Sequence, residues 1–141
     1  MHVRRDVVEV IATHARRESP RECCGLLIGT VLEVIEANAT ANVATEPHRH
    51  YQLSPVEYFA QIRRCRHATS PGAAALNVIG AYHSHPRSAP VPSPTDLQEA
   101  FGEFLYIIAG PVDGSAALAL RAYRFQGGQF EDVPLTVVGR S

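Results

Sequence analysis

The sequence contains no lysine, and all 13 of its basic residues are arginine. Codon bias in a GC-rich genome is the simplest explanation, and the absence means that nothing can be attached to this chain through a lysine side chain. An excess of charge is also absent, because the formal net charge is -1 at pH 7. A nearly neutral chain has no strong electrostatic attraction for nucleic acid or for an anionic membrane, so we expect neither as a partner.

Cysteine is scarce, and the chain has no long hydrophobic run. Two of the three cysteines, Cys23 and Cys24, are adjacent, and Cys65 falls on an apolar helical stripe. We therefore predict buried, reduced thiols rather than a disulfide framework. No apolar run approaches the roughly 20 residues of a membrane-spanning helix. Asp6 and Glu9 interrupt the segment in which a secretory signal would have its apolar core, so we expect a cytoplasmic protein.

The composition is that of a folded globular domain. Of the 141 residues, 45% are hydrophobic and 19% are charged, which is sufficient for a core in a single domain over residues 1–141. Apolar residues recur at helical spacing in two segments, and β-branched residues gather in several others. We predict helices over 3–17 and 55–68, a loop over 69–73, and strands over 25–36 (one strand or a hairpin), 49–53, 75–82, 104–109, 116–125 and 129–138. This mixture indicates an α/β domain in which helices cover a sheet.

The most informative segment begins with His83-Ser84-His85-Pro86 and ends with Pro92-Ser93-Pro94-Thr95-Asp96. Two histidines at positions i and i+2 of an extended segment point in the same direction, so both imidazoles can reach one ion. A proline-rich stretch, predicted to be irregular over 86–92, can bring the carboxylate of Asp96 back toward them. Three protein ligands that leave a fourth position for water are typical of catalytic zinc. We therefore interpret His83, His85 and Asp96 as ligands of Zn²⁺.

Repeated patterns offer other interpretations of the same residues. Ser-Pro-x-acid occurs at 19–22, 54–57 and 93–96, and each suits a helix start with serine as N-cap and proline as the first helical residue. We accept this role for 54–57 and keep it as the alternative for 93–96, which precedes a short predicted helix. His48-Arg49-His50 repeats the His-x-His spacing without a carboxylate behind a proline turn. We interpret that pair as exposed on a strand.

The downstream segment resembles the signature of the JAMM (MPN-plus) family of zinc metalloproteases. That signature is an upstream glutamate, then His-Ser/Thr-His-Pro, five residues, Pro-Ser, two residues and Asp, and residues 83–96 match it without a gap. Glu22, directly before Cys-Cys-Gly-Leu-Leu-Ile-Gly, is similar to the catalytic glutamate of the family. Asn42-Val43 and the stretch 50–62 resemble the segment that small prokaryotic members carry between the two motifs. The resemblance thus covers nearly the whole chain.

The resemblance implies a cytidine-deaminase-like MPN fold, with a curved, mixed and mostly antiparallel sheet packed by helices. It implies that Glu22 moves a proton from the attacking water to the leaving amine. It also implies that zinc and the Ser93 hydroxyl stabilise the tetrahedral oxyanion. Ser84 points away from the histidines, so we expect it to support the loop. The residues themselves indicate a zinc-dependent amide hydrolase, whereas a ubiquitin-like substrate follows from the resemblance alone.

The implied substrate is a peptide or isopeptide bond beside the C-terminal Gly-Gly of a ubiquitin-like protein. We favour a small peptidase that processes a ubiquitin-like sulfur carrier, by trimming a C-terminal extension or by releasing an amino acid such as cysteine. The alternatives are deconjugation of such carriers from lysines and a catalytically silent MPN scaffold. A DNA-repair-associated branch usually has His-Asn-His-Pro followed by Ser-Gly, from which Ser84 and Arg87-Ser88 depart. The oligomeric state stays open, a homodimer included.

Overall fold

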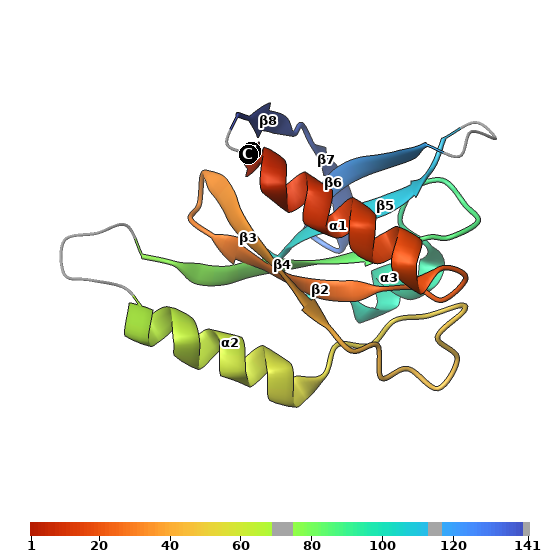
Figure 1. The fold of residues 1–141 in the computed structure, drawn as a ribbon, viewed down its shortest axis with the longest axis horizontal. Coiled ribbons are helices and arrows are strands. Elements are labelled where there is room, and N and C mark those ends of the chain that lie inside the picture. The colour runs from red at the N-terminus through yellow and green to blue at the C-terminus, as the bar shows by residue number, and fades with distance from the viewer. Residues whose placement is uncertain (69–74, 113–116, 140–141) are drawn as a thin grey trace.

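A mixed β-sheet with helices packed against it forms the fold (Figure 1). The computed structural model describes residues 1–68, 75–112 and 117–139. Within these ranges the eight-stranded sheet has the order β7-β6-β5-β4-β2-β3-β1-β8. The strands are β1 (His2–Arg4), β2 (Cys24–Gly29), β3 (Glu33–Thr40), β4 (Asn77–Ser84), β5 (Leu105–Pro111), β6 (Leu118–Gln126), β7 (Gln129–Val133) and β8 (Thr136–Val138). The helices are α1 (Arg5–Glu18), α2 (Pro55–Ala68) and α3 (Pro94–Glu99).

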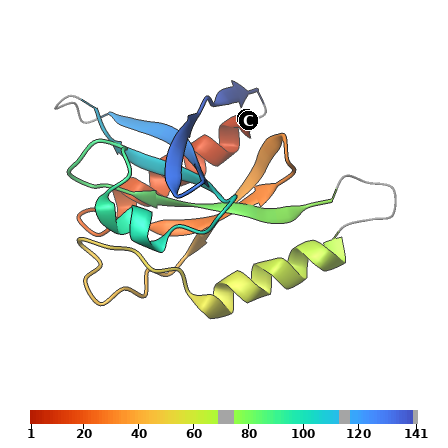
Figure 2. The same cartoon turned by 180° about the vertical axis from the view of Figure 1, so that it is seen from behind.

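Helices cover both faces of the central strands. Helix α1 inserts Val7 and Ile11 into a core that contains Leu27 of β2 and Leu105 of β5. It crosses the sheet in front of the strands in Figure 1 and behind them in Figure 2. The other side is approached by α2, whose aromatic side chains border a cavity together with Tyr106 of β5. Because both faces are covered, every residue of β2 is buried, which explains its continuous apolar sequence.

Strand β4 lies at the centre of the sheet, between one antiparallel and one parallel neighbour. Strand β4 pairs antiparallel with β2 and parallel with β5. Gly25 of β2 lies opposite Tyr82 of β4, and a Cβ atom at Gly25 would be 2.2 Å from Cε1 of Tyr82. Glycine is therefore required where the Tyr82 ring crosses β2. The Tyr82 hydroxyl hydrogen-bonds Nδ1 of His14 at 2.7 Å, which ties the end of β4 to α1.

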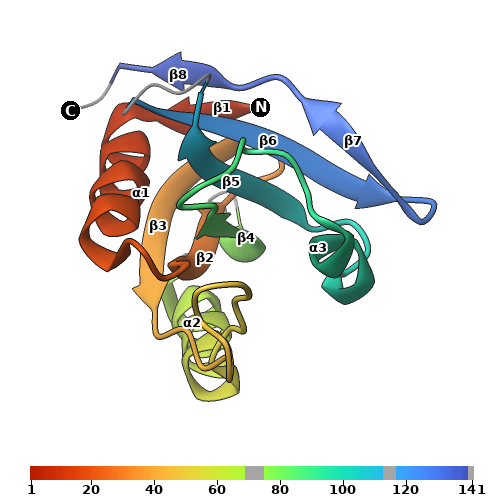
Figure 3. The same cartoon turned by 90° about the vertical axis from the view of Figure 1, so that its right-hand side faces the viewer.

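The sheet is strongly curled, as the resemblance implied. Strands β7 and β8 lie at opposite ends of the strand order, yet β7 ends at Val133 and β8 begins at Thr136. Two intervening residues can span only about 10 Å, so the two edges must approach one another. Figure 3 shows the strands bending round so that β8 and β7 follow each other along one side.

Several predicted elements are confirmed with small shifts in their ends. The predicted helix over 55–68 coincides with α2. The segment 25–36, predicted as one strand or a hairpin, is part of the hairpin of β2 and β3. The short helix after the prolines is α3. The strand predicted to end at residue 82 continues through Ser84, so His83 lies within it. The three cysteines are buried and form no disulfide, and burial raises the pKa of Cys23 and of Cys24 to about 11.

Two other expectations were wrong, and one lies outside the described residues. The predicted strand over 49–53 is a turn and loop whose single bridge joins Asn42 and Leu53, because the side chain of Asn42 takes up the His50 carbonyl and the Gln52 amide. The segment 129–138 is two strands, since Pro134 lacks the amide that a continuous ladder needs. The predicted helix over 3–17 is confirmed as α1, except that its first two residues belong to β1. The predicted loop over 69–73 falls outside the described ranges. No described helix is long and apolar enough to cross a bilayer.

Candidate metal and catalytic site

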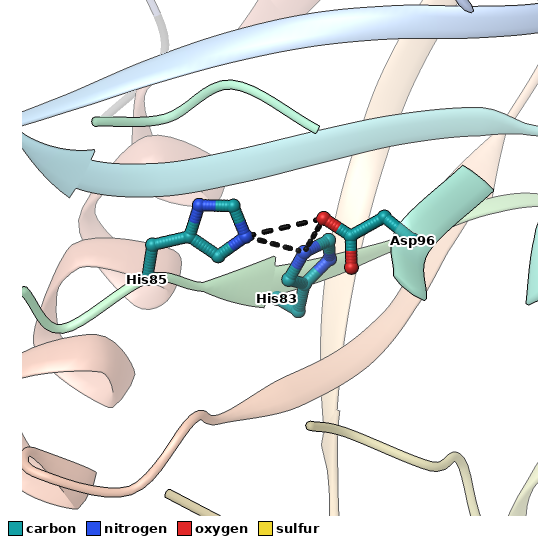
Figure 4. A group of neighbouring side chains, drawn as sticks. All are labelled: His83, His85 and Asp96. Carbon is teal, nitrogen blue, oxygen red and sulfur yellow. Dashed lines mark hydrogen bonds and ion pairs between the residues drawn. The ribbon is translucent and has the colours of Figure 1, made fainter. Parts of the chain in front are cut away.

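Three side chains from two elements converge at the end of β4 (Figure 4). His83 lies in β4, His85 follows that strand, and Asp96 lies in the first turn of α3. The Nε2 atoms of His83 and His85 are 3.2 Å apart, and each is 3.2 Å from Oδ2 of Asp96. All three residues are at most 9% exposed. Residues that the sequence separates by the irregular stretch 86–92 thus form one buried cluster.

The arrangement of these three atoms fits a cation. Nδ1 of His85 is 3.0 Å from the carbonyl oxygen of Ala89, which only accepts hydrogen bonds, so this nitrogen carries a hydrogen. In the neutral ring, Nε2 then directs a lone pair toward the carboxylate of Asp96. Ligand atoms around a tetrahedral zinc are about 3.3 Å apart, close to the separations of 3.2 Å found here. Among the described residues, no other group of three or more potential ligands is assembled in this way.

Asp96 stabilises the start of α3 as well as belonging to the cluster. Oγ of Ser93 accepts a hydrogen bond from the Asp96 amide at 3.1 Å, and Oδ2 of Asp96 accepts one from the Ser93 amide at 2.8 Å. Burial acts to raise the pKa of Asp96, but the close contacts of its carboxylate with His83 and His85 and its hydrogen bond from the Ser93 amide outweigh it and hold that pKa well below its usual value. The helix-cap interpretation of residues 93–96 is therefore confirmed, and it is compatible with metal binding.

The two histidines are oriented by different contacts. His85 is fixed by its hydrogen bond to Ala89, whereas Nδ1 of His83 is buried without a hydrogen-bond partner among the described residues. The ring of Tyr51 stacks on His83 instead, with centroids 4.2 Å apart and an angle of 16° between the planes. Burial lowers the pKa of His83, which favours the neutral ring that a metal ligand must have. Sequence reasoning missed Tyr51, because its contact with His83 follows no spacing rule.

The backbone around Glu22 is anchored by two other segments. The Glu22 amide donates to the carbonyl of Pro47 at 2.7 Å, and its carbonyl accepts from Nδ2 of Asn42 at 2.9 Å. The next amide, that of Cys23, donates to Oγ of Ser84 at 2.9 Å. Ser84, which was expected to support the loop, thus holds the backbone that follows Glu22. These contacts hold the Glu22 backbone, between α1 and β2, beside the residue that separates the two histidines.

The Glu22 side chain shares a cleft with His85 and Ser93. Glu22 is only 8% exposed, and this burial raises its pKa to about 8, with His85 lowering it and Asp96 raising it further. A carboxyl group whose pKa is near neutrality can accept a proton and release it again, as general acid–base chemistry requires. The structure thus brings all five residues singled out from the sequence to one region.

The second His-x-His segment forms no comparable cluster. His48 and Arg49 are exposed in a turn, and His50 makes a surface contact of 3.9 Å with Glu46. Nδ2 of Asn42 donates to the His50 carbonyl at 2.9 Å, in addition to that of Glu22. This loop therefore acts on the site through the backbone of Glu22, and the interpretation of the pair as lying on a strand is wrong.

Two cavities of different character border the cluster. The first has a volume of about 460 Å³ and is lined in part by Tyr51, the residue that stacks on His83. The second has a volume of about 560 Å³ and is lined in part by His85. The first is mostly apolar and is lined by Tyr51, Gln52, Leu53, Pro55, Tyr58, Phe59, Ala81, Glu99, Phe101, Phe104 and Tyr106. The second is more polar and is lined by Pro20, Glu22, His48, Arg49, His85, Pro86, Arg87, Ser88 and Ser93.

Comparison with known proteins agrees with this fold. Residues 4–125 match the family of prokaryotic homologues of the JAB domain, and the chain belongs to that family. A JAB1/MPN domain protein from Archaeoglobus fulgidus has the same fold, with a TM-score of 0.58 and 23% identity over 99% of this chain and all of that chain. The expected MPN fold is thereby confirmed.

Three relatives bear names that describe cleavage. Desampylase from Haloferax volcanii is 33% identical over 94% of this chain and 92% of its own length. A probable TtuB-protein conjugate cleaving protease from Thermus thermophilus is 31% identical, over 85% of this chain and 76% of its own. The CysO-cysteine peptidase of Mycobacterium tuberculosis is 28% identical, over 96% and 90%. The chain is accordingly a hydrolase of the JAMM type.

Proposed function

We propose that this chain is a zinc-dependent peptidase that hydrolyses the bond after the C-terminal Gly-Gly of a ubiquitin-like sulfur-carrier protein. The observation that carries the proposal is the cluster of three potential ligands, His83, His85 and Asp96, next to the buried carboxyl group of Glu22. Two histidines and one carboxylate are a donor set that suits zinc and leaves a coordination position open. A fully protein-bound structural zinc would require a fourth side chain.

Each remaining group has a chemical role in this proposal. Zinc, when bound, lowers the pKa of a water molecule toward about 7 and polarises the carbonyl group of the substrate. Glu22 accepts the proton of the attacking water and transfers it to the leaving amine. The Ser93 hydroxyl oxygen accepts the Asp96 amide hydrogen, so its own hydrogen can be donated to the oxyanion. Burial of Glu22 keeps bulk water from competing for these protons.

The names of the relatives support a small carrier protein as the substrate. They include the cleavage of a TtuB–protein conjugate and of CysO–cysteine. The apolar, aromatic cavity next to His83 could take apolar side chains of a carrier tail, while the glycine pair passes the crowded cluster. A tail that extends between the two cavities would place its last carbonyl at the cluster.

Two other functions can be distinguished from this one. A deconjugating isopeptidase would use the same site on a bond to a lysine side chain, and the name of the Thermus relative favours it. A silent scaffold would have lost a ligand or the glutamate, but His83, His85, Asp96 and Glu22 are all present. A scaffold would also fail to bind zinc.

Intact-mass analysis of the zinc-loaded protein acting on its own host's Gly-Gly carrier tests the proposal. The carrier is offered with a short C-terminal extension and, separately, as a lysine isopeptide conjugate, with a chelator control and the Glu22→Gln variant. We expect chelator-sensitive cleavage after Gly-Gly of the extended carrier. Cleavage of the isopeptide alone would favour deconjugation, and no cleavage of either would contradict the proposal.

A further inference from the structure

Two arginines in the polar cleft take no part in the chemistry described above. Arg49 comes from the loop before α2 and Arg87 from the turn after β4, and both line the cleft with Glu22, His85 and Ser93. Both side chains are exposed. Neither guanidinium group has an ion pair or a side-chain hydrogen bond to another part of the chain that the structure describes. Two cationic side chains without a protein counter-ion therefore border the reacting groups.

The position of Glu22 identifies which part of the substrate occupies this cleft. Glu22 transfers a proton to the leaving amine, so that nitrogen must come within hydrogen-bond reach of its carboxyl group. Glu22 lines the cleft with the arginines and not the aromatic cavity beside Tyr51. The leaving group therefore lies in the polar cleft, and the carrier tail lies on the other side of the cluster.

The chemistry of the leaving group then decides what the arginines can bind. When a single amino acid leaves, its α-carboxylate is separated from the leaving nitrogen by one carbon atom. A guanidinium group binds a carboxylate through two parallel hydrogen bonds assisted by charge. When a lysine side chain leaves, the nitrogen is at the end of four methylene groups and no carboxylate stands at that distance.

We propose that Arg49 and Arg87 form a subsite for the free α-carboxylate of the amino acid that leaves the carrier. This inference rests on the proposed function and narrows it to the release of a C-terminal amino acid. The cleft holds one carboxyl group of its own, Glu22, among its lining residues. A free carboxylate on the leaving amino acid supplies the counter-ion that the two arginines lack. An internal peptide or a lysine isopeptide leaves both arginines without this partner.

A carrier ending in Gly-Gly-Ala tests the subsite, made once with a free C-terminal carboxylate and once with a C-terminal amide. The two substrates differ only in the group that the arginines are proposed to bind. We expect the zinc-loaded protein to cleave the free acid with a kcat/KM about tenfold higher. The double variant Arg49→Gln with Arg87→Gln should lower the rate on the acid to that on the amide. Arg121→Gln, which changes an exposed arginine paired with Asp132 on β7, serves as control and should keep the preference.

The possible results separate this inference from the proposed function. Equal cleavage of acid and amide by the unchanged protein, or a preference that survives in the double variant, would overturn the subsite and leave the peptidase proposal standing. A second measurement does not depend on turnover. Titration of the protein with alanine and with alaninamide should shift the NMR signals of the Arg49 and Arg87 side chains with alanine alone. Identical responses to both would contradict the subsite even if neither carrier were cleaved.

Discussion

The chain contains two His-x-His segments with the same spacing, and the structure uses them differently. His83 lies in the buried end of β4 and His85 directly follows that strand, so their rings point to one side and meet Asp96 at 3.2 Å. His48 and His50 lie in a turn, and the carboxylate contact of His50 is a surface pair at 3.9 Å. Spacing therefore gives convergence only where a strand fixes the direction of the side chains.

Removal of the first pair should have the largest effect. His83→Ala or Asp96→Ala is expected to abolish measurable cleavage and to lower zinc affinity by more than about a hundredfold, since even groups that merely support a ligand contribute about 10–100-fold. Zinc content after equilibrium dialysis measures this. The matched control, His48→Ala with His50→Ala, should retain zinc. Equal zinc loss in both variants would remove the distinction between the segments.

Glu22→Gln should leave zinc binding intact and lower kcat by about 10²–10⁴-fold, because the amide cannot accept the proton of the attacking water. The substitution preserves the size of the side chain, and the backbone hydrogen bonds to Pro47 and Asn42 do not involve it. Single-turnover kinetics together with zinc analysis measures both quantities. A fully active Glu22→Gln variant would show that another group carries the proton.

The loop of the second pair should influence activity through Asn42. Asn42→Asp keeps an acceptor for the loop amides but removes the donor that holds the carbonyls of Glu22 and His50. We expect kcat to fall by about tenfold or more through misplacement of Glu22, with zinc content unchanged. Kinetics at saturating zinc, combined with thermal unfolding, tests this. An unchanged kcat would mean that the loop does not position Glu22.

Substitution of Tyr51, which stacks on His83 of the first pair, should have a smaller effect on zinc affinity. Tyr51→Leu removes the ring that stacks on His83, and we expect zinc affinity to fall by about tenfold. Tyr51→Phe keeps the ring and should bind zinc like the unchanged protein. Competition with a chromogenic chelator measures both affinities. If Leu and Phe variants behave alike, stacking does not orient His83.

The sequence predicted the cluster better than its surroundings. Residues 83–96 could be recognised because strand alternation and a helix cap are local rules that act within a few residues. The helix over 55–68 and the β2–β3 hairpin were predictable for the same reason. The contact of Tyr51 with His83 was not, because it depends on how a loop folds back across the sheet.

The strand pairing at the edges of the sheet could not be predicted from the sequence either. Strand β1 has three residues, and its partners β3 and β8 come from distant parts of the sequence. Pro134 is a local signal for the split of 129–138, but the pairing of β8 with β1 depends on the curl of the whole sheet. Local patterns carry no information on such long-range pairing. The two arginines of the cleft likewise become neighbours of Glu22 only in the folded chain.

The double role of Asp96 has a consequence for how such a site can decay during evolution. Its carboxylate accepts a hydrogen bond from the amide of Ser93, the N-cap residue of α3, so replacing it with alanine also removes one of the two hydrogen bonds of this capping box, which typically costs about 1 kcal/mol. A change at His83 or His85 carries no such penalty on α3. Descendants that abandon the chemistry are thus expected to lose the histidines first and to retain an acid, or asparagine, at position 96. Thermal unfolding of the metal-free Asp96→Ala and Asp96→Asn variants would show whether the side chain at position 96 stabilises the fold independently of metal binding.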